Sequence, residues 1–122
     1  MTNICSEKLP ESRYFYTTLF YFNVNYDSNW FIHLVSKDMQ LELEIIDSKN
    51  DMIPKEFQSK PKGFYITFVV ENTDEVHEIA KAEQFKIINK PSDMPYGQRR
   101  LLLEDPNGIL VDVSSPIKGF NS

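Results

Sequence analysis

Carboxylates and a phenol are the side chains of this chain that could carry out acid–base chemistry. Asp112 stands between Val111 and Val113, and a carboxylate in so apolar a run needs a polar environment to point into. A positioned Asp or Glu can act as a general base. Tyr65 could donate a hydrogen bond to an oxyanion that develops in a transition state. If the chain is an enzyme, Asp112 and Tyr65 are therefore the candidate catalytic residues.

A wider set of aromatic and acidic side chains could bind a ligand without reacting with it. Aromatic rings provide stacking and cation–π contacts, and a carboxylate pairs with a positive charge. A pocket built from such residues suits a planar or cationic organic molecule. Strand alternation places Tyr65, Thr67 and Asp112 on the inward-facing sides of their strands. The expected ligand-binding residues are Trp30, Glu42, Glu44, Tyr65, Thr67, Tyr96, Arg99 and Asp112.

Several of these residues also have a structural interpretation. Trp30 is more typical of a core aromatic residue than of a ligand-binding one. Glu42 and Glu44 alternate with Leu41, Leu43 and Ile45, so they line either a pocket or a solvated sheet face, with the apolar residues packed under a helix. Arg99 is expected to pair with an acid more than with a substrate.

The two histidines and the single cysteine are weaker candidates. His77 stands among acidic residues of an expected helix and is predicted to be solvated, whereas the direction of His33 stays open. Cys5 has no nearby His or helix N-terminus to activate it, which favours a packed or idle thiol. A single cysteine forms no internal disulfide, as is typical of a reducing compartment.

The composition limits the class of protein. The chain has 122 residues, 41% hydrophobic and 25% charged, which fits one folded domain. A net charge of −5 without a basic run argues against nucleic-acid binding. The apolar runs are far shorter than the roughly 20 residues of a membrane-spanning helix. The first ten residues lack the apolar segment of a signal peptide, so we expect a cytoplasmic protein.

The periodicity of the chain predicts the same series of elements twice. A weak strand at residues 1–6 precedes a helix at about 9–20, where Pro10 suits the first turn. Asn72, with Glu75 three residues later, indicates the start of a second helix. The remaining patterns predict strands at 21–26, 30–36, 39–46, 64–70, 85–89, 99–104 and 109–114, and loops at 47–62 and 91–97.

The order strand, helix and three strands therefore occurs in each half. Module one covers about residues 1–50, a linker about 51–62, and module two about 63–117, within a single domain covering 1–122. Neither half could bury its sheet alone. We predict an α+β fold in which two tandem βαβββ modules form a curved mixed sheet around a shared cleft.

The order of these elements, together with four short motifs, resembles the pattern of the vicinal-oxygen-chelate superfamily. This superfamily includes glyoxalase I, bleomycin-resistance proteins and extradiol dioxygenases. Tyr96 stands where the family usually has Trp, and Ile109 where Asn is common. Asp105 can bond within its own turn, and Asn107 and Gly108 tolerate positive φ. The motifs are residues 12–16 of the first helix, Gly63 with the strand after it, Pro91–Arg99, and Asp105–Gly108.

The resemblance implies four metal-ligand positions, and this chain fills them poorly. The first falls at or before Met1, the second at Glu42 or Glu44, the third at Tyr65 and the fourth at Asp112. Divalent metal sites of this kind favour imidazole and carboxylate ligands. We therefore expect no metal and no other cofactor, although a divalent metal with non-standard ligands is not excluded.

Two functions follow as hypotheses. The first is a metal-independent binding protein of the bleomycin-resistance type that holds a small aromatic or cationic compound. The second is a lyase, isomerase or dioxygenase-like enzyme that uses the cleft carboxylates. The family commonly forms homodimers, and we expect one here, with Tyr14, Tyr21 and Phe22 as exposed aromatic residues that could serve the interface.

Overall fold

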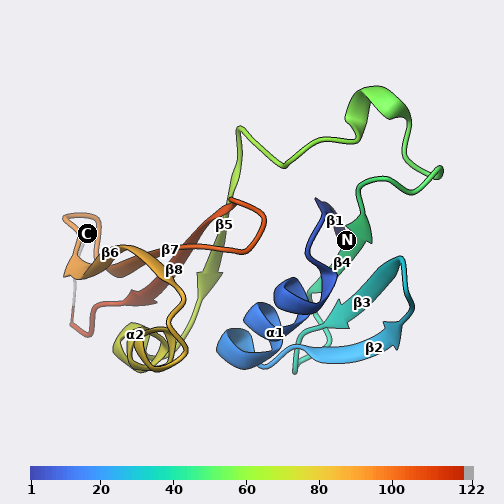
Figure 1. Cartoon of the computed structure of the whole chain (residues 1–122). Helices are drawn as coiled ribbons and strands as arrows, with labels where there is room; N and C mark the ends of the chain where they lie inside the picture. Colours follow the sequence, from blue (N-terminus) through green and yellow to red (C-terminus); the bar gives the residue numbers. More distant parts are fainter. Residues whose placement is uncertain (120–122) are drawn as a thin grey trace. The chain divides into compact units, whose positions relative to one another are not determined.

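The computed structural model describes residues 1–119 and contains two compact units. Unit 1 comprises Met1–Lys62 together with Pro106–Gly108. Unit 2 comprises Gly63–Asp105 and the chain from Ile109 onward. Each unit contains one α-helix and one four-stranded sheet, and these elements are labelled in Figure 1.

The sheet of unit 1, which we call the first sheet, has the strand order β1-β4-β3-β2. Strand β1 runs parallel to β4, and the other pairs are antiparallel. Residues between β4 and unit 2 include a short 3₁₀ helix, η1 (Lys55–Phe57). The elements are β1 (Thr2–Ser6), α1 (Leu9–Phe20), β2 (Asn23–Asp27), β3 (Phe31–Val35) and β4 (Glu42–Asp47).

Helix α1 forms because Pro10 occupies its first turn and an apolar stripe follows at helical spacing. The stripe includes Phe15, Tyr16 and Leu19, all fully buried, and the rings of Phe15 and Tyr16 meet edge to face with centroids 4.9 Å apart. Burial of each such side chain stabilises the fold by about 1.5–3 kcal/mol. The helix covers one face of β3 and β4, and we refer to the opposite face of this sheet as its open face.

Unit 2 repeats this plan in a second sheet with the order β5-β8-β7-β6, where β5 runs parallel to β8. Asn72 caps α2 as expected, since its side chain accepts a hydrogen bond from the Glu75 backbone N–H. The predicted α+β fold with two βαβββ modules is therefore confirmed, while the shared cleft stays a prediction. The elements are β5 (Tyr65–Val69), α2 (Thr73–Ala82), β6 (Lys86–Asp93), β7 (Gln98–Glu104) and β8 (Leu110–Pro116).

The structure corrects the predicted loop at residues 91–97. Strand β6 continues through Pro91 to Asp93, and the pairing with β7 is irregular between Asn89 and Ser92. Since β6 is at the edge of the sheet, the missing N–H of Pro91 can face away from the ladder. Edge position and irregular register together explain why proline is tolerated here.

Two predicted side-chain positions are wrong. Phe22 was expected to be exposed but is buried, with its ring edge-on to Tyr16 at 6.5 Å. Tyr21 ends α1 with a φ of 57° and turns the chain, so Tyr21 is exposed and Phe22 points inward. Leu41 was expected under the first helix with Leu43, but it precedes β4 and is 54% exposed.

The turn between β7 and β8 holds its shape as predicted at Asp105, whose Oδ1 accepts a hydrogen bond of 2.8 Å from the Ile109 N–H. Gly108 has a φ of 86°, whereas the φ of Asn107 is not positive. Instead the buried Asn107 side chain accepts a hydrogen bond from Ser6 at 2.6 Å and donates one to Ser12 at 3.0 Å. Asn107 is thus a polar link inside unit 1 as well as a turn residue.

Candidate functional site

The open face of the first sheet presents polar and aromatic side chains. Alternation along β3 turns Ile32 and Leu34 toward α1 and Phe31 and His33 to the other face. His33 lies directly opposite Glu44 in the ladder, so these two side chains are neighbours on the open face. We define the open-face site as Asn25, Tyr26, Trp30, Phe31, His33, Glu42 and Glu44.

His33 is the centre of a hydrogen-bonded chain in this site. The Asn25 side-chain N–H donates to Nδ1 of His33 at 3.0 Å. Because an amide nitrogen can only donate, Nδ1 is the acceptor and Nε2–H donates to Glu42 Oε1, 2.9 Å away. These two bonds hold the imidazole in one orientation with both ring nitrogens occupied.

An aromatic cluster lies beside the His33 chain. Tyr26 stacks on Phe31, with centroids 5.1 Å apart and planes inclined by 13°. Trp30 meets Phe31 edge to face at 4.4 Å and is half-buried. The π-faces of this cluster offer a surface for a planar or cationic group.

Glu44 adds a second carboxylate to the open-face site. Its side chain is half-buried, and within residues 1–119 its carboxylate has no hydrogen-bond or ion-pair partner. Glu42, by contrast, is exposed and engaged by His33. A diagonal position in the ladder brings Glu44 within reach of the Phe31 ring. The site therefore combines one available carboxylate with aromatic rings.

Asp112 lies on the face of the second sheet that is turned away from α2, where Thr67 lies opposite it in the ladder. Its Oδ2 accepts a hydrogen bond from Thr67 at 3.0 Å. Its Oδ1 accepts from Arg100 Nε at 3.2 Å and from Ser114 at 2.9 Å. The carboxylate is buried and its bonding capacity is directed to the protein's own side chains.

The donors around Asp112 do not fit a metal ligand. The Arg100 guanidinium already pairs with this carboxylate, and a second cation at the same oxygens would be repelled. Tyr65, at the third position that the resemblance implies, offers a neutral phenol. Within the described residues, no three His, Cys, Asp or Glu side chains gather closely enough to hold a metal ion.

The other predicted site residues are dispersed. Tyr65 is exposed on β5, on the same face as Thr67 and Asp112. Tyr96 is exposed in the loop between β6 and β7. Arg99 lies on the α2 side of its sheet, the opposite face from Asp112.

Sequence reasoning missed Arg100, Asn25 and the role of His33. Strand parity applied to β7 could have found Arg100, because Asp112 lies opposite Leu102 and Arg100 shares that face. No sequence signal marks Asn25, since the irregular pairing between Val24 and Tyr26 brings it to His33.

Arg99 bonds two acids, one in the first turn of α2 and one at the end of β6. It donates to both Asp74 carboxylate oxygens, at 3.0 and 3.1 Å, and to Asp93 at 2.9 Å. The hydrogen bonds from Arg99 hold the pKa of Asp74 below its ordinary value of 3.8. The same acids raise the pKa of Arg99 above its usual range.

The lowered pKa of Asp74 predicts a small pH dependence of stability. A carboxyl whose pKa is lower in the folded state stabilises the fold above its unfolded pKa and loses this contribution as the pH falls through the folded pKa. Because the pair is largely exposed, we expect Asp74→Asn to cost only about 0.5 kcal/mol at pH 6 and less near pH 2. Urea denaturation at both pH values measures the difference. An equal cost at both would contradict the ion-pair explanation.

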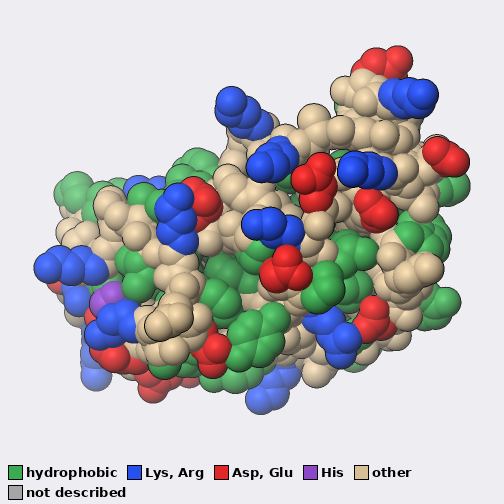
Figure 2. All heavy atoms as spheres, in the orientation of Figure 1, with side chains coloured by type: hydrophobic (Ala, Val, Ile, Leu, Met, Phe, Trp, Pro, Cys, Tyr) green, Lys and Arg blue, Asp and Glu red, His purple; other side chains and the backbone are tan. Residues whose placement is uncertain are grey.

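Charged side chains of both signs are interspersed on the surface drawn in Figure 2, including the segment around η1. In the described part of the chain, neither helix is long and apolar enough to cross a membrane.

The chain is a glyoxalase-like protein of α+β architecture: residues 2–118 match the sequence model of the glyoxalase-like domain. It therefore belongs to the glyoxalase-like domain family, within the glyoxalase/bleomycin resistance/dioxygenase superfamily. A comparison with curated proteins finds no match.

Solved structures from several bacteria share this fold. One is a glyoxalase/bleomycin resistance protein/dioxygenase family enzyme from Burkholderia phytofirmans, with a TM-score of 0.79, 20% identity, and coverage of 94% of this chain and 95% of that one. A lactoylglutathione lyase from Agrobacterium tumefaciens has a TM-score of 0.72, 18% identity, and coverage of 98% and 96%. A fosfomycin resistance protein from Listeria monocytogenes has a TM-score of 0.72 and 15% identity, and the match covers 96% of this chain and 91% of that one. At these identities the likeness shows the fold alone.

Proposed function

We propose that this protein binds a small cationic aromatic compound without a metal, on the open face of the first sheet. The observation that carries the proposal is the Glu44 carboxylate, which is half-buried and, within residues 1–119, unpartnered. Glu44 is diagonal in the ladder to Phe31, on which Tyr26 stacks. A carboxylate withdrawn from water without a partner is unfavourable, and a bound cation would supply that partner. A ligand ring would stack on the aromatic cluster.

The rest of the site supports a binding role more than catalysis. Both nitrogens of His33 are engaged, so the imidazole is held as a wall of the site. Asp112 is bonded to Arg100, Thr67 and Ser114, which leaves it a poor general base. The net charge of −5 attracts cations to the molecule as a whole.

The alternative function, an enzyme, is suggested by the names of proteins whose solved structures share this fold. Structures with this fold include proteins named as a lactoylglutathione lyase and a fosfomycin resistance protein. An enzyme of either kind would use carboxylates of the chain with or without a divalent metal. The experiment below distinguishes it from a binding protein.

Phenyltrimethylammonium and its neutral isostere tert-butylbenzene are the matched probes, since they differ in charge and hardly in shape. We expect the cation to bind at least about tenfold more tightly, as a single well-placed ion pair is worth roughly 1.4 kcal/mol. Glu44→Gln should abolish this preference. Glu78→Gln on α2, which changes the net charge equally, should leave it intact. Chemical-shift changes in a titration followed by NMR give the affinities.

Equal binding of the two probes, or an unchanged preference in Glu44→Gln, would overturn the proposed site. Metal analysis of protein purified without chelator tests the enzyme alternative separately. A stoichiometric divalent metal that is lost in Glu44→Gln would replace the binding function with metal chemistry at the same residue.

A further inference from the structure

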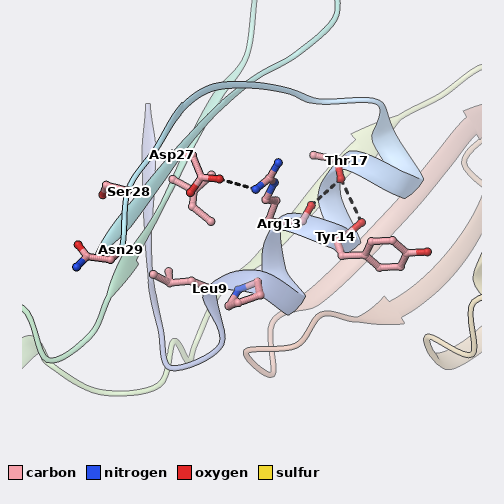
Figure 3. Close-up of a pocket in the computed structure, with 9 residues that line it drawn as sticks. Leu9, Arg13, Tyr14, Thr17, Asp27, Ser28 and Asn29 are labelled. Carbon is pink, nitrogen blue, oxygen red and sulfur yellow. Dashed lines mark hydrogen bonds and ion pairs between the residues drawn. The ribbon is translucent and has the colours of Figure 1, made fainter.

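A cavity of about 570 Å³ lies on the α1 side of the first sheet, on the other face from the open-face site. Figure 3 shows its two walls, one from α1 and one from the end of β2 and the turn after it. Its size falls within the range of small-molecule pockets, about 300–1,000 Å³. Ile32, which is buried and turned toward α1, forms part of its lining.

An ion pair crosses this cavity. Arg13 on α1 donates from Nη1 to Oδ2 of Asp27 at the end of β2, and Figure 3 shows the two side chains pointing toward one another. Both side chains are well exposed, at 48% and 40%. A pair this exposed contributes only about 0–1 kcal/mol, so a ligand can open it at little cost.

The charges decide which ligand can open the pair. An anion that binds Arg13 leaves Asp27 without its partner, and a cation that binds Asp27 does the same to Arg13. A zwitterion satisfies both at once. Its carboxylate can accept two parallel hydrogen bonds from the guanidinium, and its ammonium group can donate to the carboxylate.

The remaining lining is mixed, since it includes the polar side chains of Thr17, Ser28 and Asn29 as well as apolar ones. Leu9 and Pro10 at the start of α1 and Ile32 of β3 provide the apolar part of the lining. We propose that this cavity binds an α-amino acid with a large apolar side chain, its two charged groups taken by Arg13 and Asp27. The site is distinct from the proposed open-face site, because Ile32 and His33 point to opposite faces of β3.

Three probes test the zwitterion requirement: L-phenylalanine, N-acetyl-L-phenylalanine and L-phenylalaninamide. The second lacks the ammonium charge and the third lacks the carboxylate. We expect L-phenylalanine to bind about fivefold more tightly than either, because each loses one ion pair at a residue that is well exposed to solvent. Calorimetric or NMR titration measures the three affinities.

Two variants assign the charges to their partners. Arg13→Gln should bind L-phenylalanine no better than L-phenylalaninamide, and Asp27→Asn should bind it no better than the N-acetyl compound. Both residues are exposed, and thermal unfolding checks that each variant remains folded. Glu44→Gln is the matched control, since it alters the open-face site and should leave amino-acid binding unchanged.

Similar affinities for all three probes, or no binding of L-phenylalanine, would overturn the zwitterion site. Loss of binding in Glu44→Gln with retention in Arg13→Gln would place the amino acid on the open face and overturn the cavity assignment. Failure of phenyltrimethylammonium to bind bears only on the open-face proposal.

Discussion

Asp112→Ala is expected to lower the free energy of unfolding by about 2–3 kcal/mol, because it removes a buried carboxylate that satisfies three donors. The Thr67 and Ser114 hydroxyls would lose their acceptor, and Arg100 would keep a positive charge without its partner. The Arg100 side chain is 24% exposed to solvent, which limits the loss. Urea denaturation followed by circular dichroism measures it.

A double-mutant cycle separates the ion pair from the hydrogen bonds. Asp112→Ala combined with Arg100→Ala should be less destabilising than the sum of the two single variants, since the unpaired charge disappears. Glu42→Ala, which removes an exposed carboxylate, should change stability by less than about 0.5 kcal/mol. A loss below 1 kcal/mol in Asp112→Ala, or strict additivity in the cycle, would show that the carboxylate does not organise this sheet.

Asn107→Ala is expected to cost about 2 kcal/mol, because its buried amide bonds two serines of unit 1. Ser6 would lose the acceptor of its hydroxyl proton, and Ser12 would lose a donor. The two serine oxygens are 3.3 Å apart, so they can compensate in part by bonding to each other. Equilibrium denaturation gives the change in stability.

Asn107→Asp provides the matched comparison for this network. The aspartate keeps the acceptor for Ser6 but has no N–H for Ser12, and it places a charge where the asparagine is buried. It should therefore be at least as destabilising as alanine at neutral pH. Ser6→Ala combined with Asn107→Ala should show coupling of at least about 0.5 kcal/mol. A stable Asn107→Asp variant would contradict the hydrogen-bond assignment.

Local sequence signals were sufficient for most of the fold. Pro10 and the apolar spacing after it predicted α1, and Asn72 with Glu75 predicted the start of α2. The end of β6 was missed because Pro91 is typical of loops, and only its edge position in the sheet makes it acceptable. Edge position is a tertiary property that a single strand's composition does not contain.

The site was less predictable because it depends on pairing between strands. Parity correctly placed Thr67 with Asp112, since alternation within each strand is fixed by backbone geometry. The Asn25–His33–Glu42 chain required the relative register of three strands, including an irregularity in β2. The Arg13–Asp27 pair joins a helix to a strand end, and no periodicity along the chain relates the two.

The membership of Pro106–Gly108 in unit 1 has a consequence for synthesis on the ribosome. The chain up to Lys62 contains every strand of the first sheet, yet Asn107, which bonds Ser6 and Ser12, is translated 45 residues later. At about 5–20 residues per second this is a delay of roughly 2–9 s. During that interval the nascent first half lacks the amide that bonds Ser6 and Ser12, and a ribosomal pause before Asn107 would lengthen the interval.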